Sequence, residues 1–374
     1  MKAKAIGLYV HVPFCVRKCR YCDFASFPTS DLSVRDEYIN ALCREIDSYS
    51  GRGLCVSTVF FGGGTPSLLS PEEFSKITSH IRSAFKILPN AEFTLEANPG
   101  TVTEDKLKSY IACGVNRVSI GLQSIHENEL KKLGRIHNYQ EFLDCYSLVR
   151  RLGITNVNVD LMYGIPEQTK DSFRKTLGEV IALNPEHISA YGLIIEEGTP
   201  FFSERDTLAL PSEELECDMY YLAADMLRCA GYSHYEISNY AKAGQECLHN
   251  LTYWHADEYI GVGLSAYSYF DGHRFGNTRD VCEYISGVRT VDDAKLSIDD
   301  EAFEFAMLGL RLSEGFSLSE YRERFSIDFL ENRGSLIKRL SDAGYILLID
   351  GRICLTERGF YVSNSILREL LLGY

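Results

Sequence analysis

The sequence lacks a long hydrophobic run. No apolar stretch of about 18 residues, the length a membrane-spanning helix needs, occurs in the chain. Residues 1–6 also lack the apolar core of a secretory signal peptide. Positive charge is scarce, with 38 Lys and Arg against 52 Asp and Glu, whereas nucleic-acid binding needs a concentrated cationic surface. These absences predict a cytoplasmic protein with no transmembrane segment and no nucleic-acid partner, whose contact with any membrane would be peripheral.

The first half of the chain alternates short β-rich runs with amphipathic stretches, the pattern of parallel βαβ units with right-handed crossovers. The predicted strands lie at 8–12, 58–61, 92–96, 117–121, 156–162 and 187–194. The predicted helices lie at 34–48, 71–85, 104–113, 139–152 and 170–183. Such units form a barrel or an open sheet, and in both cases ligands gather at the carboxyl ends of the strands. The sequence therefore predicts the α/β class.

The pattern changes twice further along the chain, which divides it into three regions. Residues 1–195 form the predicted α/β domain, 196–297 an aromatic-rich connecting region, and 298–374 a small C-terminal domain. In the last region, helical patterns at 301–312, 318–325 and 335–343 precede a type I′ hairpin signal at Asp350-Gly351. Helices followed by a hairpin are typical of a winged helix. Acids are mixed with the bases here, so we expect a packing or lid module rather than a DNA-binding one.

Three of the twelve cysteines follow the first predicted strand at the spacing C-x3-C-x2-C, as Cys15, Cys19 and Cys22. Thiolates are soft ligands that select iron–sulfur clusters, zinc or Cu(I). Three cysteines can anchor three irons of a [4Fe–4S] cube and leave the fourth iron for a small chelating ligand. A Cys3His zinc site with His11 is the alternative, but such sites usually pair their ligands at two distant positions. Disulfides do not suit a chain without a signal peptide.

Polar or glycine residues stand at the ends of the next four predicted strands. The Gly62–Pro66 loop ends one of them, and Glu96, Gln123 and Asp160 lie at or near the ends of the others. Glycines let the backbone approach a ligand closely, and the loop lacks the GxxxxGK[ST] pattern of a phosphate-binding loop. Single polar residues at strand ends are usually turn formers. Four of them in one repeat pattern predict a ligand site.

The connecting region holds the single tryptophan of the chain, in the segment from Cys247 to His255. Its aromatic, lightly charged composition suits a flat conjugated ligand. Histidine commonly ligates the iron of a porphyrin, so His249 and His255 are candidate axial ligands. The alternative is that the aromatic side chains fill the open side of the barrel and that His249 is a hydrogen-bonded core residue. The residues alone leave both interpretations open.

Together these motifs resemble the coproporphyrinogen-dehydrogenase-like radical S-adenosylmethionine (SAM) family. The resemblance rests on residues 9–15, 22–24, 62–66, 96–99, 134–135 and 160–166. It implies a partial (β/α)6 TIM-like barrel with a C-terminal helical, winged-helix-like domain, and a [4Fe–4S] cluster on Cys15, Cys19 and Cys22. It also implies the residues that contact SAM, which are Tyr9, Tyr21, Gly63, Gly64, Thr65, Glu96, Gln123, Arg135, Asp160 and, through its backbone, Ile194.

Two branches of that family can be told apart by residues near the cysteine motif and in the connecting region. The oxygen-independent coproporphyrinogen III dehydrogenases carry a long leader and a fourth cysteine at the position of Phe24. Cys22-Asp23-Phe24 and the H-N-x-x-Y-W segment at 249–254 instead resemble the HemW heme chaperones. That resemblance implies heme binding with a contact at His249, and delivery of heme to respiratory or storage proteins. The dehydrogenase is the alternative function, and a radical SAM enzyme acting on RNA is disfavoured by the acidic charge.

Overall fold

The computed structural model describes residues 5–28, 31–331 and 333–372. Its centre is one large sheet of twelve strands in the order β14-β13-β12-β11-β1-β4-β5-β6-β7-β8-β10-β9. The six strands of the βαβ repeat lie side by side in it and run parallel. They are β1 (Ile6–Val12), β4 (Cys55–Gly63), β5 (Lys86–Ala97), β6 (Arg117–Gln123), β7 (Asn156–Tyr163) and β8 (His187–Gly192). The prediction of a partial six-stranded barrel is confirmed.

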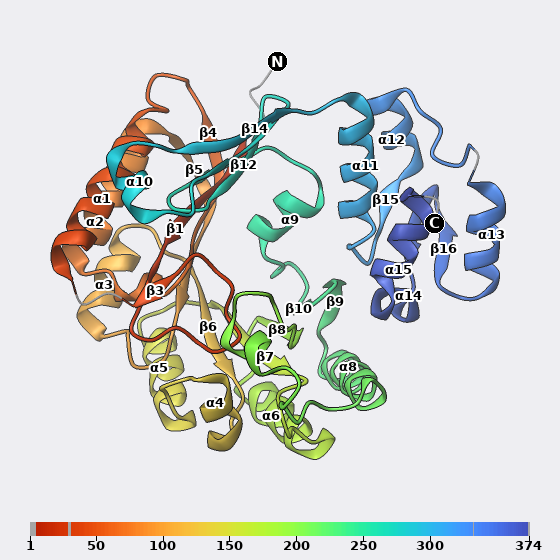
Figure 1. Ribbon diagram of the computed structural model, residues 1–374, viewed down its shortest axis with the longest axis horizontal. Helices are drawn as coiled ribbons and strands as arrows, with labels where there is room; N and C mark the ends of the chain where they lie inside the picture. The colour runs from red at the N-terminus through yellow and green to blue at the C-terminus, as the bar shows by residue number, and fades with distance from the viewer. Residues whose placement is uncertain (1–4, 29–30, 332, 373–374) are drawn as a thin grey trace.

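The helices of the repeat lie along the outer face of this sheet (Figure 1). They are α1 (Leu32–Asp47), α2 (Pro71–Ala84), α3 (Glu104–Ala112), α4 (Glu127–Leu133), α5 (Tyr139–Arg151) and α6 (Lys170–Leu183). Local sequence sets where they begin: Ser70, Asn138 and Thr169 each form a capping box with the residue three positions later. Five of these helices were predicted within two residues at each end. The short helix α4 was not predicted.

Residues 200–295 extend the sheet at both edges. Strand β11 (Tyr259–Val262) runs parallel to β1, and the antiparallel strands β12 (Tyr267–Phe270), β13 (His273–Asn277) and β14 (Thr290–Lys295) follow it. At the other edge, β10 (Asn239–Ala241) and β9 (Ser233–Glu236) continue from β8. This region also supplies the helices α7 (Pro200–Glu204), α8 (Glu213–Cys229), α9 (Leu248–Trp254) and α10 (Val281–Ser286).

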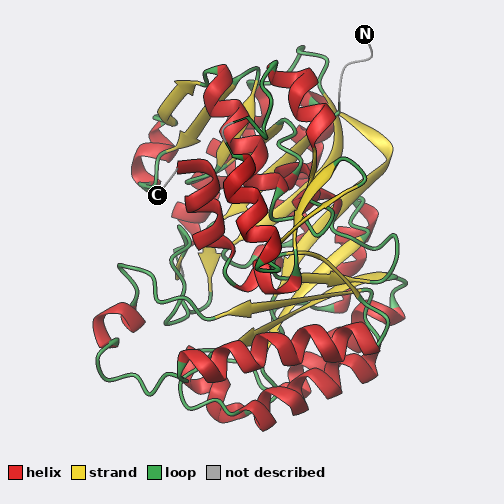
Figure 2. Cartoon of the chain, turned by 90° about the vertical axis from the view of Figure 1, so that its right-hand side faces the viewer, coloured by secondary structure: helices red, strands yellow, loops and turns green. Residues whose placement is uncertain are grey.

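The C-terminal domain packs beside the barrel as helices and a small sheet (Figures 1 and 2). Its elements are α11 (Ile298–Gly309), β15 (Phe316–Ser317), α12 (Leu318–Phe325), α13 (Gly334–Asp342), β16 (Ile346–Ile349), β17 (Arg352–Leu355), α14 (Glu357–Tyr361), α15 (Ser363–Leu367) and a last turn, Arg368–Leu372. Both hairpin residues, Asp350 and Gly351, have positive φ angles of 50° and 72°, as a type I′ turn requires. The helices α11, α12 and α13 and the hairpin were predicted, whereas α14, α15 and the last turn were not.

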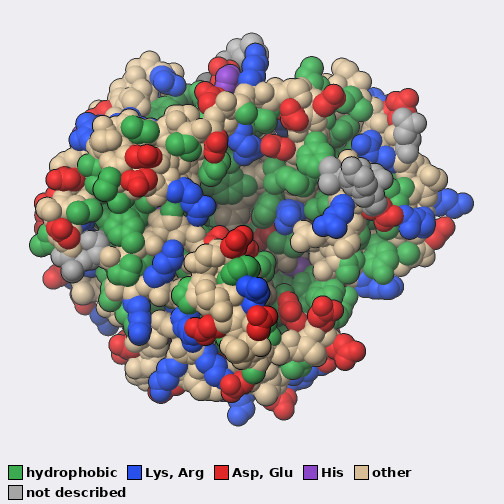
Figure 3. Space-filling model, in the orientation of Figure 1, with side chains coloured by type: hydrophobic (Ala, Val, Ile, Leu, Met, Phe, Trp, Pro, Cys, Tyr) green, Lys and Arg blue, Asp and Glu red, His purple; other side chains and the backbone are tan. Residues whose placement is uncertain are grey.

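Among the described residues, no helix combines the length and the apolar character needed to cross a bilayer. The face seen in Figure 3 is hollowed near its centre, between the barrel and the C-terminal domain. Helix α9 lies on this inner side of the sheet, where it contacts β1, β4 and α11. The interior of the half-barrel is therefore partly filled by the segment that contains the single tryptophan.

Candidate cluster and cofactor site

A cavity of about 330 Å³ lies at the carboxyl ends of the parallel strands. Its lining includes the three cysteines of the loop that follows β1, together with the glycine loop after β4 and polar residues from β5, β6 and β7. Eleven of the fourteen site residues that the family resemblance implies line it: Cys15, Cys19, Tyr21, Cys22, Gly63, Gly64, Thr65, Glu96, Gln123, Arg135 and Asp160. The topology explains this, because parallel strands bring their carboxyl ends to one edge.

The loop from Phe14 to Pro28, which we call the cluster loop, is fixed at both ends by backbone hydrogen bonds. The short strand β2 (Phe14–Cys15) pairs with β3 (Phe27–Pro28), and the N–H of Thr65 donates to the carbonyl of Phe14 at 2.8 Å. In the middle of the loop, the N–H of Arg20 donates to the carbonyl of Leu133 at 3.0 Å. The three thiols are thus presented at the cavity by a loop whose backbone is anchored to its walls.

Each thiol has a polar neighbour. Cys15 Sγ lies 3.9 Å from Thr65 Oγ1, Cys19 Sγ lies 3.6 Å from Arg135 Nη1, and Cys22 Sγ lies 4.0 Å from Ser26 Oγ. Burial raises the pKa of both Cys15 and Cys22. All three cysteines are free thiols. Iron bound by Cys15 and Cys22 would therefore have to displace their protons, as metal binding by cysteine generally does.

The arrangement does not match a zinc site. Across the described residues, no three His, Cys, Asp or Glu side chains are placed to hold a single metal ion. His11 turns away from the thiols, since its Nε2 lies 3.0 Å from the carbonyl of Ala25 and its Nδ1 lies 3.0 Å from the hydroxyl of Tyr9. A single ion needs every thiolate within about 2.3 Å, whereas the irons of a cube stand at separate corners. Three separated thiols at one cavity therefore fit the cluster better.

The glycine loop lies directly against the cluster loop. A Cβ on Gly64 would come within 2.6 Å of the carbonyl oxygen of Phe14, and a Cβ on Gly63 within 2.5 Å of the His11 ring. Gly63 also has φ of +107°, which residues with a side chain rarely adopt. Both positions thus require glycine so that the strand end can pass beside the cysteines. The N–H of Gly63 donates to Glu96 at 3.1 Å.

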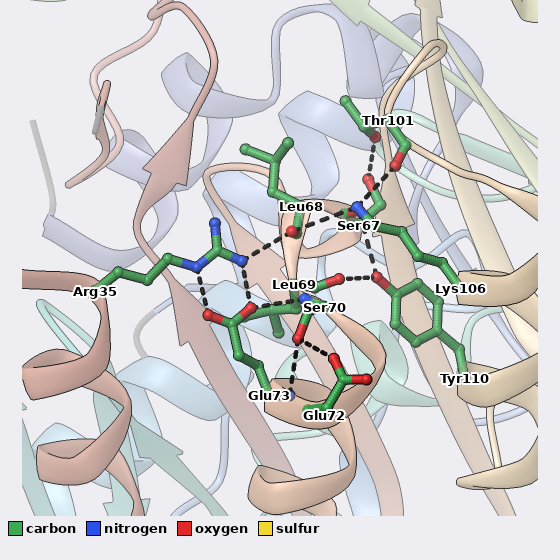
Figure 4. A network of polar contacts seen from close by, with 10 residues as sticks. All are labelled: Arg35, Ser67, Leu68, Leu69, Ser70, Glu72, Glu73, Thr101, Lys106 and Tyr110. Atoms are coloured by element: carbon green, nitrogen blue, oxygen red, sulfur yellow. Dashed lines mark hydrogen bonds and ion pairs between the residues drawn. The ribbon is translucent and has the colours of Figure 1, made fainter. Parts of the chain in front are cut away.

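The turn that follows the glycine loop is held from below by a polar network, seen in Figure 4. Lys106 donates to the carbonyls of Ser67, Leu68 and Thr101 at 3.1, 3.4 and 3.2 Å. Arg35 donates to the carbonyl of Leu68 at 2.8 Å and also pairs with Glu73. Because these side chains satisfy the carbonyls of the turn, the glycine loop is fixed in place before any ligand arrives.

The wall beside the glycine loop is polar. Arg135 donates to Asn98 Oδ1 at 2.7 Å and to the carbonyl of Gly121. Asp160 accepts hydrogen bonds from Ser119 at 2.9 Å and from Asn158 at 2.7 Å. Burial, with the nearby Asp160 charge, raises the pKa of Glu96 to about 8. The wall combines one cation with two carboxyl groups.

This cavity fits a zwitterionic ligand such as SAM. Two buried polar atoms at its wall, Gln123 Oε1 and Arg135 Nε, have no hydrogen-bond partner among the described residues, and buried polar groups are normally satisfied. Gln123 also adopts φ of 70°, a strained angle for a non-glycine residue, which often occurs at functional sites. SAM carries amino, carboxylate and hydroxyl groups that can satisfy such atoms.

Three predicted site residues do not line the cavity. Tyr9 lies behind it, with its ring near Gly62 and its hydroxyl on His11. The strand predicted at 187–194 ends at Gly192, so Ile194 lies in the following loop and is 68% exposed. His249 is buried in α9, where its two ring nitrogens contact Thr58 and Tyr253. The predicted roles of these three residues stay predictions.

The site also contains residues that the sequence analysis did not single out. Asn98 bridges Thr65 and Arg135 through its amide, with contacts of 2.9 and 2.7 Å, and Ser119 and Tyr191 also line the cavity. Asn98 directly follows Ala97, so its position after a predicted strand was a usable signal. Ser119 carries no such signal, because a serine inside a strand is ordinary.

Comparison with known proteins agrees with this geometry. Residues 9–180 match the Radical SAM superfamily, and residues 296–362 match the HemN C-terminal domain. The coproporphyrinogen III oxidase HemN of Escherichia coli has the same fold, with a TM-score of 0.88 over 100% of this chain and 91% of that one, at 24% identity.

Relatives at higher identity carry another name. The heme chaperone HemW of Escherichia coli is 37% identical, with 99% of each chain covered. The heme chaperone HemW of Bacillus subtilis is 35% identical, with 97% of this chain and 98% of that one covered. The Lactococcus lactis heme chaperone HemW is 33% identical, with 100% of this chain and 99% of that one covered. The chain therefore belongs to the HemW family of radical SAM proteins.

Proposed function

We propose that this protein is a cytoplasmic heme chaperone built on a radical SAM barrel. It holds a [4Fe–4S] cluster and SAM, binds heme, and passes the heme to respiratory or storage proteins at or near the membrane. The observation that carries this proposal is the match to proteins named heme chaperones along essentially the whole chain, at 33–37% identity. The similarity to HemN, at 24% identity, supports the fold alone.

The cavity supplies the groups that the cluster and SAM require. Cys15, Cys19 and Cys22 would hold three irons, and Arg135 stands beside the Cys19 sulfur at 3.6 Å, where its positive charge favours a bound thiolate. Glu96 and the Gly63–Gly64 backbone would receive the amino-acid part of SAM. A bound cluster supplies one-electron reduction of the SAM sulfonium. The cavity walls would hold the ligand beside the cluster.

Heme would be bound by the aromatic inner side of the barrel. Helix α9, which lies on this side, carries His249, Tyr253 and Trp254, and flat conjugated ligands bind well against aromatic rings. Phe24, which is 57% exposed at the rim of the cavity, stands where the dehydrogenases carry a fourth cysteine. Its apolar ring suits a heme-binding surface and provides no metal ligand.

The test is anaerobic reconstitution with iron and sulfide, followed by a hemin titration of the full chain. We expect about four irons and four sulfides per chain, a saturable Soret band on adding hemin, and transfer of that heme to apomyoglobin as a generic acceptor. Failure to bind hemin would contradict the proposal. So would anaerobic conversion of coproporphyrinogen III to protoporphyrinogen IX with SAM and reductant, which the dehydrogenase function requires.

A further inference from the structure

A continuous run of polar contacts links two of the three thiols at the cavity. At one end, Cys15 Sγ lies 3.9 Å from Thr65 Oγ1, and that oxygen accepts a hydrogen bond from Asn98 Nδ2 at 2.9 Å. At the other end, Asn98 Oδ1 accepts from Arg135 Nη2 at 2.7 Å, and Arg135 Nη1 lies 3.6 Å from Cys19 Sγ. Asn98 therefore stands between the two groups that contact the sulfurs.

The amide of Asn98 can take only one orientation in this run. A guanidinium only donates hydrogen bonds, so Arg135 must face the amide oxygen, which leaves the NH2 group for Thr65. A hydroxyl has a single proton to donate. Because Asn98 donates to Thr65, the hydroxyl proton of Thr65 stays available for the sulfur of Cys15. Both ends of the run thus present a donor to a cysteine sulfur.

The backbone of Asn98 is held on both sides. Its N–H donates to Ser67 Oγ at 3.3 Å, and its carbonyl accepts from the N–H and the hydroxyl of Thr101 at 3.2 and 2.7 Å. Ser67 and Thr101 also contact each other through their hydroxyls (Figure 4). The amide group of Asn98 therefore projects from a fixed turn toward Arg135.

The neighbouring strand β6 leaves room for the pair that Asn98 forms with Arg135. A Cβ on Gly121 would come within 2.7 Å of Arg135 Nη2 and 3.0 Å of Asn98 Oδ1. The same Arg135 nitrogen donates to the carbonyl of Gly121 at 2.5 Å. Glycine weakens the interior of a strand and often marks a place where another group approaches closely. At this position it allows the two side chains to meet.

We propose that Asn98 is a positioning residue, which directs the donors of Thr65 and Arg135 at two cluster-binding sulfurs and so raises the reduction potential of the cluster. This inference rests on the [4Fe–4S] cluster of the proposed function. Reduction takes one electron from a low-potential reductant and adds one negative charge, which the sulfurs share. Hydrogen bonds to the sulfurs stabilise that charge and raise the potential. Cys22, whose polar neighbour is Ser26 at 4.0 Å, lies outside the run.

Redox titrations of the reconstituted full chain with dithionite test this role, with electron paramagnetic resonance reporting the reduced cluster in the absence of SAM and hemin. Asn98→Leu removes both side-chain hydrogen bonds in a similar volume, and Thr65→Val removes the hydroxyl that faces Cys15. For each we expect electron uptake weaker by about ten-fold, a fall in potential of about 59 mV for one electron. Two controls should keep the wild-type potential: Thr65→Ser, which retains the hydroxyl, and Asn40→Leu, on the exposed side of α1.

A double variant shows whether Asn98 acts through Thr65. If the amide keeps the hydroxyl directed at Cys15, Thr65→Val should lower the potential less in the Asn98→Leu background than in the wild type, because contacts within one network are not additive. Equal shifts in the two backgrounds would mean that the residues act independently, and would overturn the inference.

Iron and sulfide counts on each variant separate a change in potential from a loss of cluster. If Asn98→Leu holds fewer than four irons, Asn98→Asp, which keeps the shape, takes its place. Its carboxylate would accept the Thr65 hydroxyl proton in place of the sulfur, so adding Thr65→Val should lower the potential no further, and a further fall would overturn the inference.

The outcomes also separate this inference from the proposed function. If the loaded wild type, Asn98→Leu and Thr65→Val share one potential, the role of Asn98 is overturned, whereas hemin binding and transfer are measured separately and leave the chaperone function standing. If the wild type takes up no cluster, the inference and the proposed function fail together.

Discussion

Replacement of Glu92 by Gln should loosen helix α9 selectively. Glu92 is a buried residue of β5 whose carboxylate accepts hydrogen bonds from the N–H groups of Leu248 and His249, each at 3.0 Å. Its Oε1 also lies 3.5 Å from Cys247 Sγ. Helix α9 has no N-terminal cap from its own Cys247 side chain, so this carboxylate from the sheet takes the place of a cap.

The expected loss follows from two changes. A glutamine has one acceptor oxygen, so one of the two backbone N–H groups faces an amide NH2, and an unsatisfied buried donor costs about 1–3 kcal/mol. The substitution also removes a negative charge close to Arg117, a 2% exposed residue. Burial works against the Arg117 charge, while Cys247 and Glu92 help hold its pKa above the ordinary value. We add roughly 2 kcal/mol for the loss of this charged partner of Arg117. The free energy of unfolding should therefore fall by about 4 kcal/mol in total.

The single tryptophan makes the assay direct, because Trp254 lies in α9 itself. In urea unfolding of the chain without heme, Trp254 fluorescence reports α9 and far-ultraviolet circular dichroism reports the whole barrel. For Glu92→Gln we expect the fluorescence transition to move to lower urea and to precede the dichroism transition. Glu37→Gln, on the exposed side of α1, is the control and should change stability by less than about 0.5 kcal/mol. Coincident transitions within 1 kcal/mol of the wild type, roughly the error of such a comparison, would refute the role assigned to Glu92.

Three further predictions concern the cavity. Cys19→Ser should lose nearly all bound iron and sulfide, measured after anaerobic reconstitution, whereas the exposed Cys282→Ser should keep both. Gly64→Ala should destabilise by about 1–3 kcal/mol and weaken SAM binding by calorimetry, because its Cβ meets backbone at 2.6 Å. Gly178→Ala, in a helix with open space, should instead stabilise by about 0.5–1 kcal/mol. Burial raises the pKa of Glu96 in the folded protein to about 8. Its protonated form therefore stabilises the fold fully below the unfolded pKa near 4.5, and this contribution is lost as pH rises to about 8. As pH rises through that window, thermal unfolding should show the stability of Glu96→Gln increasing relative to the wild type, by up to about 1.4 kcal/mol per pH unit. A difference in stability that does not change with pH would contradict this prediction.

Much of the fold could be predicted because its signals are local. Helix α6 was predicted at its observed bounds, where Thr169 and Ser172 form a capping box. Strand β7 was predicted to end one residue before its observed end. The strands β11–β14 were not predicted, because pairing between β1 and β11 joins residues about 250 positions apart and leaves no periodic trace in either segment. Helix α4, with seven residues, is too short for a clear apolar period.

The candidate site could be predicted where one residue type has one use. The cysteine spacing and the glycine loop are recognisable in the sequence as parts of a ligand site. The order of the parallel strands then brings Glu96, Gln123 and Asp160 to the same edge of the sheet. The roles of Asn98 and Ser119 depend on which side chain stands opposite them. That information is tertiary, because Arg135 reaches Asn98 from a loop 37 residues away.

His249 could not be assigned from the sequence, because a core histidine and a metal-binding histidine leave the same local pattern. In the structure the ring is 1% exposed, and its two nitrogens contact Thr58 and Tyr253 at 2.8 Å each. Burial, together with the Arg117 charge, lowers the pKa of His249 to about 3, so the ring is neutral. These are the properties of a hydrogen-bonded core residue. A role of His249 in heme binding stays a prediction, and it would require one of these two contacts to break, because both nitrogens are already engaged.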